Sequence, residues 1–301
     1  MHILITGATG FVGQALCHSL KAQGHTVIAI SRSVERARRQ LGADVDCFES
    51  VYAMLKARPD IIIDAVVNLA GAPIADKRWM ADYKRTLIES RVQATQDVVA
   101  LCERLNEPPQ VVVSGSAMGY YGDQGETVVT ESTIAHDDFA HRLCQSWEAA
   151  TLPLQALGVR CAIIRLGLVL GAKGGMFQRM YWPFRCGLGG WIGAGENFMP
   201  WVFIDDVIRA IEWLIKDNTA QGPYNVSGPE PVRQRTFMEM VGQRLHRPVK
   251  LCMPASVAFM LLGERALMFT TGADMRPARL TESGFAFTAP TLGAALTQVF
   301  R

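Results

Sequence analysis

The sequence has few charged residues, and their charges almost cancel. Lys and Arg together number 30, Asp and Glu together number 28, and charged residues make up 19% of the chain, against about 25% in an average globular domain. We find no basic block and no interleaving of basic with aromatic residues. Because proteins that bind the phosphate backbone carry a clear basic excess, we do not expect nucleic acid as a partner.

The sequence also lacks the marks of export, membrane insertion and metal binding. No apolar run is long enough to span a bilayer, and the chain enters a strand at residues 3–6 without a basic lead or a cleavage site. The seven cysteines are odd in number and form no CxxC pair, which favours reduced thiols over a disulfide framework or a zinc site. HExxH and Gly-x-Ser-x-Gly motifs are missing as well, so metal and acyl-transfer chemistry are disfavoured. We predict a cytoplasmic protein with no metal site and no membrane partner.

Short apolar segments alternate with amphipathic segments through the first half of the chain. This alternation predicts an α/β fold, a Rossmann-type doubly wound parallel sheet with helices on both faces. Uninterrupted apolar runs such as residues 65–67 fit strands that are buried on both sides. Strands are expected at residues 2–6, 26–30, 45–48, 64–68, 111–114 and 161–166, and helices at 11–23, 34–41 and 139–157.

The character of the sequence changes after Leu166. Residues 171–175 and 187–195 are rich in glycine, and helical patterns follow at 207–216, 237–246 and 256–268. We predict a Rossmann domain over residues 1–166 and a smaller C-terminal α+β substrate domain over residues 167–301. The boundary is soft, because strands of the second half can return to the main sheet.

A glycine loop joins the first predicted strand to the first predicted helix. Gly7 permits the tight turn out of the strand, Gly10 lets the backbone approach a pyrophosphate, and Gly13 lets the helix pack against the sheet. The positive end of the helix then faces the phosphates, so we predict that this loop binds a dinucleotide. The other predicted contacts of the loop are Thr9, Phe11 and Val12.

The end of the second strand decides between NAD and NADP. An acidic residue there would bind the ribose hydroxyls and repel a 2′-phosphate. The sequence instead has Ser31 and Arg32, with no carboxylate before Glu35. Ser31 can donate a hydrogen bond to a phosphate, and Arg32 can pair with it or stack on the adenine, although a solvated surface arginine is the alternative. We therefore expect NADP(H) in preference to NAD(H).

Further motifs follow the later strands, at the edge where open α/β sheets bind ligands. They are Asn68-Leu69-Ala70-Gly71, Ser114-Gly115-Ser116-Ala117, and the segments 165–171, 201–207 and 222–226. With these motifs the chain resembles the extended short-chain dehydrogenase/reductase superfamily over nearly its whole length. More narrowly, it is similar to an atypical "epimerase family" branch with a small C-terminal domain of unknown function. The segments that carry this narrower similarity are 71–79, 90–91, 147–148, 276–280 and 284–287.

The resemblance implies a nucleotide held by the glycine loop, by the end of the second strand and by the end of the fourth. It also implies that Ser116 is the serine that hydrogen-bonds the substrate oxygen. The predicted cofactor contacts beyond the loop are Ser31, Arg32, Leu69, Ala70, Gly71, Ser114 and Arg165.

The superfamily relies on a Tyr-x-x-x-Lys helix, in which the lysine lowers the pKa of the tyrosine so that the phenol can exchange a proton with the substrate. That helix falls at residues 139–143 here. Phe139 stands at the tyrosine position and has no proton to give, and Leu143 stands at the lysine position and has no charge. The usual acid–base pair is therefore missing.

Several groups could replace the missing acid. Tyr120 and Tyr121 follow Ser116 closely, and a phenol there could donate a proton, although an aromatic wall is the alternative. His141 titrates near neutrality, but a solvent-facing helical histidine is the plainer interpretation. We take Ser116, Tyr120 and Tyr121 as the candidate catalytic residues. Three cations could bind an anionic substrate or the cofactor phosphates, or simply face water: Lys77, Arg78 and Arg91.

Two functions fit these residues. The first is an NADP(H)-dependent oxidoreductase acting on a small polar substrate between the domains, with Ser116 polarising the carbonyl and a tyrosine or water supplying the proton. The second is a catalytically inactive NADP(H) sensor or binding module. An enzyme needs an open, polar cavity beside the nicotinamide, whereas a sensor could have that space filled by Phe139 and Leu143. Helical segments at 87–105 and 143–157 could also form a four-helix interface between two copies of the chain, so a homodimer is one of the assemblies that the sequence allows.

Overall fold

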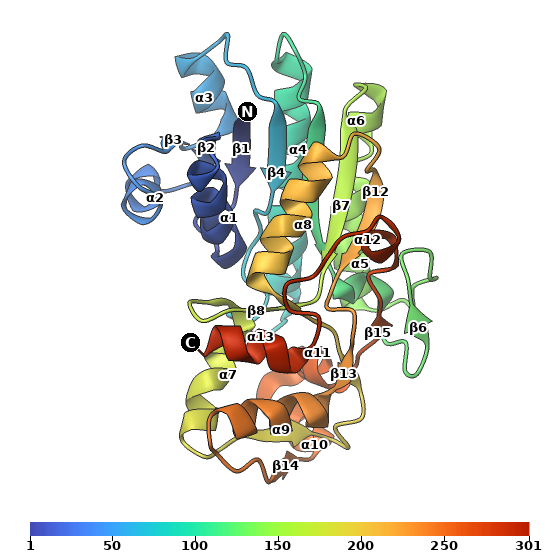
Figure 1. Ribbon diagram of the computed structural model, residues 1–301. Coiled ribbons are helices and arrows are strands. Elements are labelled where there is room, and N and C mark those ends of the chain that lie inside the picture. Colours follow the sequence, from blue (N-terminus) through green and yellow to red (C-terminus); the bar gives the residue numbers. More distant parts are fainter. Residues whose placement is uncertain (301) are drawn as a thin grey trace.

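The protein is built around a seven-stranded parallel sheet. In the computed structural model, which describes residues 1–300, the strand order is β12-β7-β5-β4-β1-β2-β3. The chain leaves β1 toward β2 on one side and returns to β4 on the other, which is the doubly wound arrangement with its switch point between β1 and β4. The predicted Rossmann-type α/β fold is confirmed (Figure 1).

The strands and helices of the first half lie close to the predicted segments. The strands are β1 (His2–Thr6), β2 (Thr26–Ile30), β3 (Asp46–Phe48), β4 (Ala65–Asn68), β5 (Val111–Ala117) and β7 (Arg160–Leu166), and the helices are α1 (Phe11–Ala22), α2 (Val34–Leu41), α3 (Val51–Ala57) and α4 (Ala81–Arg104). Each sheet strand pairs in parallel with its neighbours, as in Ile3 with Val27 and with Ala65. Parallel strands need crossover helices, which is why helices alternate with strands along the chain.

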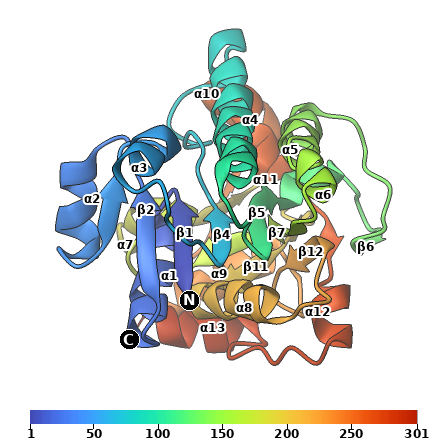
Figure 2. The same cartoon turned by 90° about the horizontal axis from the view of Figure 1, so that it is seen from above.

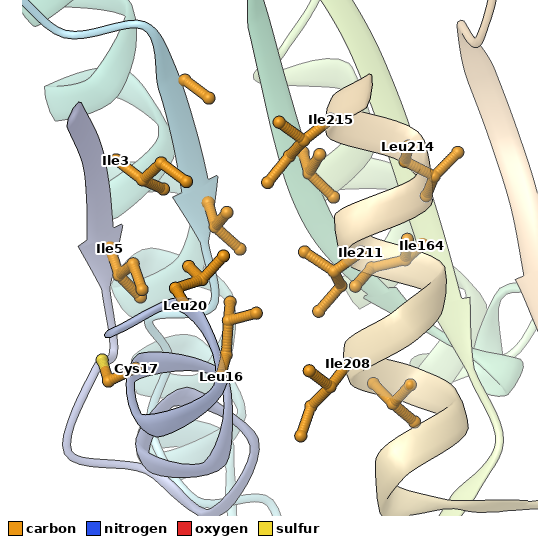
Figure 3. Packing of buried hydrophobic residues seen from close by; sticks show 14 of the residues in the cluster. Ile3, Ile5, Leu16, Cys17, Leu20, Ile164, Ile208, Ile211, Leu214 and Ile215 are labelled. Atoms are coloured by element: carbon orange, nitrogen blue, oxygen red, sulfur yellow. The ribbon is translucent and has the colours of Figure 1, made fainter. Parts of the chain in front are cut away.

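Helices cover both faces of the sheet (Figure 2). On one face α1 and α8 (Ile204–Lys216) pack side by side, and Leu16 and Ile211 meet Ile5 of β1 in a fully buried cluster (Figure 3). On the other face α3 and α4 contribute Met54 and Val98 to a second buried cluster. Each fully buried aliphatic side chain stabilises the fold by about 1.5–3 kcal/mol, so the two helical layers stabilise the central sheet.

The second half of the chain forms a further layer beyond the carboxyl ends of the main strands (Figure 1). Its elements are α7 (Gly175–Arg185), α9 (Gln234–Arg244), α10 (Ala255–Leu262), α11 (Leu267–Thr270) and α13 (Leu292–Val299), with two-stranded sheets that include β8 (Leu168–Leu170) and β11 (Trp201–Phe203). Trp201, Phe237 and Leu292 lie in its own buried cluster. Some elements after residue 166 nevertheless complete the main sheet and its cover: β12 (Gly222–Val226) pairs with β7, and α8 packs on the sheet.

Two predicted helices are wrong in their extent. The helix expected at 139–157 is divided into α5 (Phe139–Ala149) and α6 (Pro153–Ala156), because Pro153 has no N–H group and stands at the first position of the second helix. The helix expected at 256–268 is interrupted at Gly263, whose φ of 60° ends α10. Across residues 1–300, none of the helices combines the length and the apolar character that crossing a bilayer would need.

Candidate functional site

The glycine loop between β1 and α1 is packed too closely for side chains at two positions. Gly7 has a φ of 70°, and a Cβ there would lie 2.7 Å from the carbonyl oxygen of Leu69. A Cβ at Gly13 would lie 2.3 Å from the carbonyl oxygen of Gly7. Only glycine therefore permits this turn, the contact with the end of β4, and the close packing of α1.

The first turn of α1 is open to an anion. Its N-cap is Gly10, which has no side chain to accept hydrogen bonds from the free amides, and the first turn contains no acidic residue. The loop is instead closed by the N–H of Gly10, which donates to the carbonyl oxygen of Gly7 at 2.9 Å. Amides at the start of a helix that lack an internal acceptor, together with the positive end of the helix dipole, form a phosphate site.

The end of β2 presents a hydroxyl and a cation beside this loop. Ser31 is half-buried and its hydroxyl donates a 3.3 Å hydrogen bond to the carbonyl oxygen of Ser33. Arg32 is exposed and forms neither a hydrogen bond nor an ion pair within residues 1–300. The nearest acidic residue in sequence, Glu35, faces Arg39 across α2 at 3.8 Å. The geometry thus leaves Arg32 free for a phosphate.

A cavity of about 370 Å³ opens from the start of α1. Its lining runs from Phe11 and Val12 of α1, past the ends of β5 and β7, to the C-terminal segment 267–273. A Cβ atom at Gly171 or Gly174 would lie only 2.6 or 2.7 Å from the ring of Phe11. Glycine at these two positions therefore lets the second half of the chain pack closely against α1. The volume lies at the lower end of the range for small-molecule sites.

Arg91, on α4, contributes a buried cation to this cavity. Its side chain packs against Gly71, where a Cβ would lie 3.0 Å from the guanidinium carbon. The guanidinium lies 5.0 Å from the ring centre of Trp147 and donates to the carbonyl oxygen of Leu87, but its buried Nε has no partner within residues 1–300. Burial lowers the pKa of Arg91. A buried, under-bonded cation beside the phosphate loop is suited to binding an anionic group.

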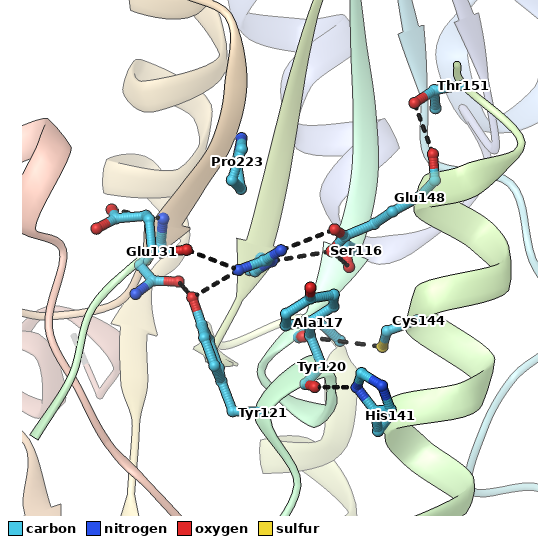
Figure 4. Close-up of polar contacts among 12 residues, drawn as sticks. Ser116, Ala117, Tyr120, Tyr121, Glu131, His141, Cys144, Glu148, Thr151 and Pro223 are labelled. Atoms are coloured by element: carbon cyan, nitrogen blue, oxygen red, sulfur yellow. Dashed lines mark hydrogen bonds and ion pairs between the residues drawn. The ribbon is translucent and has the colours of Figure 1, made fainter. Parts of the chain in front are cut away.

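Ser116 belongs to a buried polar network beside the cavity (Figure 4). Its hydroxyl donates a 2.6 Å hydrogen bond to Oε1 of Glu148, and Ser116 is only 2% exposed. The same carboxylate is held by two hydrogen bonds from Arg165, of 2.9 and 2.8 Å. Burial alone would lower the pKa of Arg165, but the hydrogen bonds and charge of Glu148 raise it above its usual value.

Tyr121 extends the network toward β12. Arg165 donates to the phenol oxygen at 2.9 Å, and the phenol donates to Oδ1 of Asn225 at 2.6 Å. Burial raises the pKa of Tyr121 to about 12. A hydroxyl has a single proton, so Ser116 and Tyr121 both use theirs within the protein, and neither lies in the cavity lining.

Tyr120 and His141 pack against this network. The guanidinium carbon of Arg165 lies 3.4 Å from the ring centre of Tyr120. The hydroxyl of Tyr120 makes no hydrogen bond within the described chain. His141 is buried, with Nδ1 at 2.5 Å from the carbonyl oxygen of Tyr120. The interpretation of His141 as a solvent-facing residue is therefore wrong, because α5 turns it toward the strand end.

Phe139 and Leu143 take different places around the cavity. The ring of Phe139 packs at 5.1 Å against that of Trp79 and lies outside the cavity lining. Leu143 lies in the lining, one turn along α5, close to Cys144 and Trp147. The space is therefore open rather than filled, but its wall at this helix is apolar.

The remaining predicted residues are distributed as follows. Leu69, Ala70 and Gly71 lie at the end of β4 against the glycine loop, whereas Ser114 is buried and accepts a 3.4 Å hydrogen bond from Asn68. Sequence reasoning missed the cavity wall at 267–273 and the place of Asp138 in the lining. Asp138 carries a helix-cap signal, but no local pattern indicates that a segment more than a hundred residues away would lie opposite it.

Comparisons with known proteins agree with this architecture. A family model described as the NAD dependent epimerase/dehydratase family matches residues 3–227, and a domain of unknown function, DUF1731, matches residues 253–299. An epimerase family protein from Mycobacterium bovis is 34% identical over 296 residues, which are 98% of this chain and 96% of that protein. The epimerase family protein YfhF from Bacillus subtilis is 33% identical over 300 residues, 99% of this chain and 98% of its own.

Solved structures show the same fold. The human epimerase family protein SDR39U1, crystallised with NADPH, superposes with a TM-score of 0.89 at 30% identity, covering 100% of this chain and 99% of that chain. A UDP-glucuronic acid 4-epimerase from Bacillus cereus, in complex with UDP-glucuronic acid and NAD, superposes with a TM-score of 0.76 at 18% identity, covering 100% of this chain and 98% of that chain. The second likeness extends to the fold alone.

Proposed function

The chain belongs to the NAD-dependent epimerase/dehydratase family, and from that premise we propose that it is an NADP(H)-dependent oxidoreductase. The observation that carries the proposal is the open first turn of α1, whose free amides lead directly into the cavity. The NADPH in the crystals of the human relative supports the choice of cofactor. When bound, NADPH supplies a hydride at the nicotinamide.

The residues present fit such a cofactor. The amides of residues 11–13 would bind the pyrophosphate, because glycine at positions 7 and 13 permits the tight turn that presents the start of α1. Arg91 would add a positive charge from the guanidinium that it brings to the lining. Ser31 and Arg32 would hold the 2′-phosphate, which has no carboxylate to repel it at the end of β2.

The protein's part in the reaction would be to orient the substrate and to exclude water. The apolar wall of α5 and the segment 267–273 would enclose the reacting groups. Of the three candidate catalytic hydroxyls, Ser116 and Tyr121 already donate their protons inside the protein. Tyr120, like them, lies outside the cavity lining, so we propose a water molecule in the cavity as the proton donor.

A catalytically inactive NADP(H) sensor is the second candidate. It is favoured by Phe139 and Leu143, which stand where the superfamily has its tyrosine and lysine, and by the internal use of the Ser116 proton. A sensor would bind NADPH as tightly as an enzyme. It would not oxidise NADPH in the presence of any carbonyl compound, whereas an oxidoreductase would.

The cofactor assignment is tested by titrating the pure protein with NADPH and NADH beside an Arg32→Ala variant. We expect NADPH to bind more tightly than NADH, and Arg32→Ala to weaken NADPH binding about 10- to 100-fold, since a hydrogen bond to a charged group contributes about 1.5–3 kcal/mol. NADH binding should not change. Arg39→Ala, on α2 and facing Glu35, is the matched control and should keep the preference. Equal affinities of the wild-type protein for both nucleotides would refute the NADP assignment.

A further inference from the structure

The cavity is walled mostly by apolar side chains that still face open space. Several of them are partly exposed although they lie in the lining, among them Ile74, Met118, Leu168, Val169, Met268 and Phe269. They come from the loop after β4, the end of β5, β8 and α11, so every side of the cavity contributes. Apolar surface left in contact with water is unfavourable, and its burial by an apolar occupant would drive binding.

Charged groups are scarce in the same lining. Within the described residues, Arg91 and Asp138 are the charged side chains that reach it. Arg91 lies at the cofactor side, against Gly71. Asp138 caps α5, and its Oδ1 accepts a 2.7 Å hydrogen bond from the backbone N–H of His141, so the acidic residue of the lining stands at the start of α5. A negative charge there disfavours an anionic occupant.

Three cations on elements around the cavity are bound to protein partners. Lys84 forms an ion pair with Glu264, and Arg179 forms one with Asp76. Arg265 donates a 3.0 Å hydrogen bond to the carbonyl oxygen of Ala75. A second diphosphate, such as that of a nucleotide sugar, would need at least one further cation, and these are already used to hold the two halves of the chain together.

We propose that the cavity beyond the cofactor takes a neutral, largely apolar substrate with one carbonyl or hydroxyl group, and not a nucleotide sugar. This inference rests on the proposed function, because it assigns the phosphate loop and Arg91 to NADP(H). It replaces the small polar substrate expected from the sequence. The hydroxyl or carbonyl would meet the few polar groups of the lining, and the apolar body would cover the partly exposed side chains.

Two probes that share a naphthalene ring but differ in charge test the proposal, with a nucleotide sugar as the third compound. Protein saturated with NADPH is titrated by calorimetry with neutral 2-acetylnaphthalene, with anionic 2-naphthoate, and with UDP-glucose. We expect the neutral ketone to bind at least about tenfold more tightly than the carboxylate, and UDP-glucose to give no binding heat. Tighter binding of 2-naphthoate or UDP-glucose than of the ketone would overturn the proposal. Absence of NADPH binding in the first step would instead refute the proposed function, so the two failures are distinct.

Variants locate the probe. Met268→Arg places a charge in the cavity wall and should weaken binding of the ketone at least about tenfold. Met260→Arg makes the same change on α10, where Met260 is 70% exposed and outside the lining, and should change it less than about twofold. Ile74→Arg, in the loop after β4, is a second cavity variant in case Met268→Arg loses NADPH binding. Unchanged ketone binding in both cavity variants would show that the probe sits elsewhere and would overturn the proposal.

Discussion

The ion pair between Glu148 and Arg165 offers a direct test of the network beside the cavity. Both side chains are almost fully buried, and the guanidinium donates to both carboxylate oxygens. Glu148→Gln keeps the shape of the side chain and removes its charge. Arg165, which is 3% exposed, would then be a buried cation without a counter-charge. In addition, the amide NH₂ group of the new glutamine would face the guanidinium, so two donors would meet where the carboxylate oxygen had accepted a hydrogen bond.

The expected loss is large for a single substitution. Breaking a buried ion pair from one side costs about 3–5 kcal/mol, because the remaining charge stays buried and unpaired. A chain of 301 residues has an unfolding entropy of about 0.6 kcal/mol per degree, so a loss of about 4 kcal/mol lowers Tm by about 6 °C. Ser116→Ala removes one hydrogen bond but leaves Glu148 bound to Arg165, so it should lower Tm by only about 2 °C.

Thermal unfolding followed by circular dichroism and calorimetry measures these shifts. The double variant Glu148→Leu with Arg165→Met removes both charges and should be more stable than Glu148→Gln alone, since an apolar pair of similar size costs less than a lone buried charge. A Glu148→Gln protein whose Tm falls by less than about 2 °C would show that the pair is not buried as described. So would a double variant less stable than the single one.

Two further predictions follow from the glycine loop and from the thiols. Gly13→Ala places a Cβ 2.3 Å from the carbonyl oxygen of Gly7, so we expect at least about tenfold weaker NADPH binding by fluorescence titration, while Gly293→Ala, whose nearest neighbour would be 3.7 Å away, should bind normally. At pH 8, a thiol reagent such as DTNB should modify the exposed Cys186 and Cys252 quickly and Cys144 slowly, because burial raises the pKa of Cys144 to about 12 and keeps it protonated. Since that folded-state pKa lies above the ordinary value of 9.0, the contribution of this thiol to stability is complete below pH 9 and falls as the pH rises toward 12. Rapid modification of Cys144 in the folded protein at pH 8 would contradict the burial on which this rests.

The sequence predicted the strand, loop and helix at the start of the chain well because their signals are local. The glycine spacing, the strand before it and the helix after it lie within residues 2–22, and the structure places them together as one turn. Strands buried on both faces are apolar throughout, so Val66 and Val112 could be assigned to a sheet without knowing their partners. The sequence analysis predicted one continuous helix after Phe139, because the apolar pattern continues across the break between α5 and α6. Pro153 was the signal that a second helix begins there.

The substrate half could not be predicted in the same way. The family resemblance assigned Ser116 to substrate binding, but the direction of its single proton depends on Glu148, which lies on another element. The buried place of His141 likewise depends on the turn at Tyr120, to which its Nδ1 is held.

Thus the sequence by itself determined the strands of the first half, the glycine loop and the loss of the tyrosine–lysine pair. Each of these features depends on residues that lie close together in the chain. The tertiary structure alone decided the shape and polarity of the cavity. It brings together Ile74, in the loop after β4, and Met268 of α11, which are far apart in sequence and pack against one buried cluster. Long-range packing of this kind leaves no periodic pattern along the chain from which it could be read.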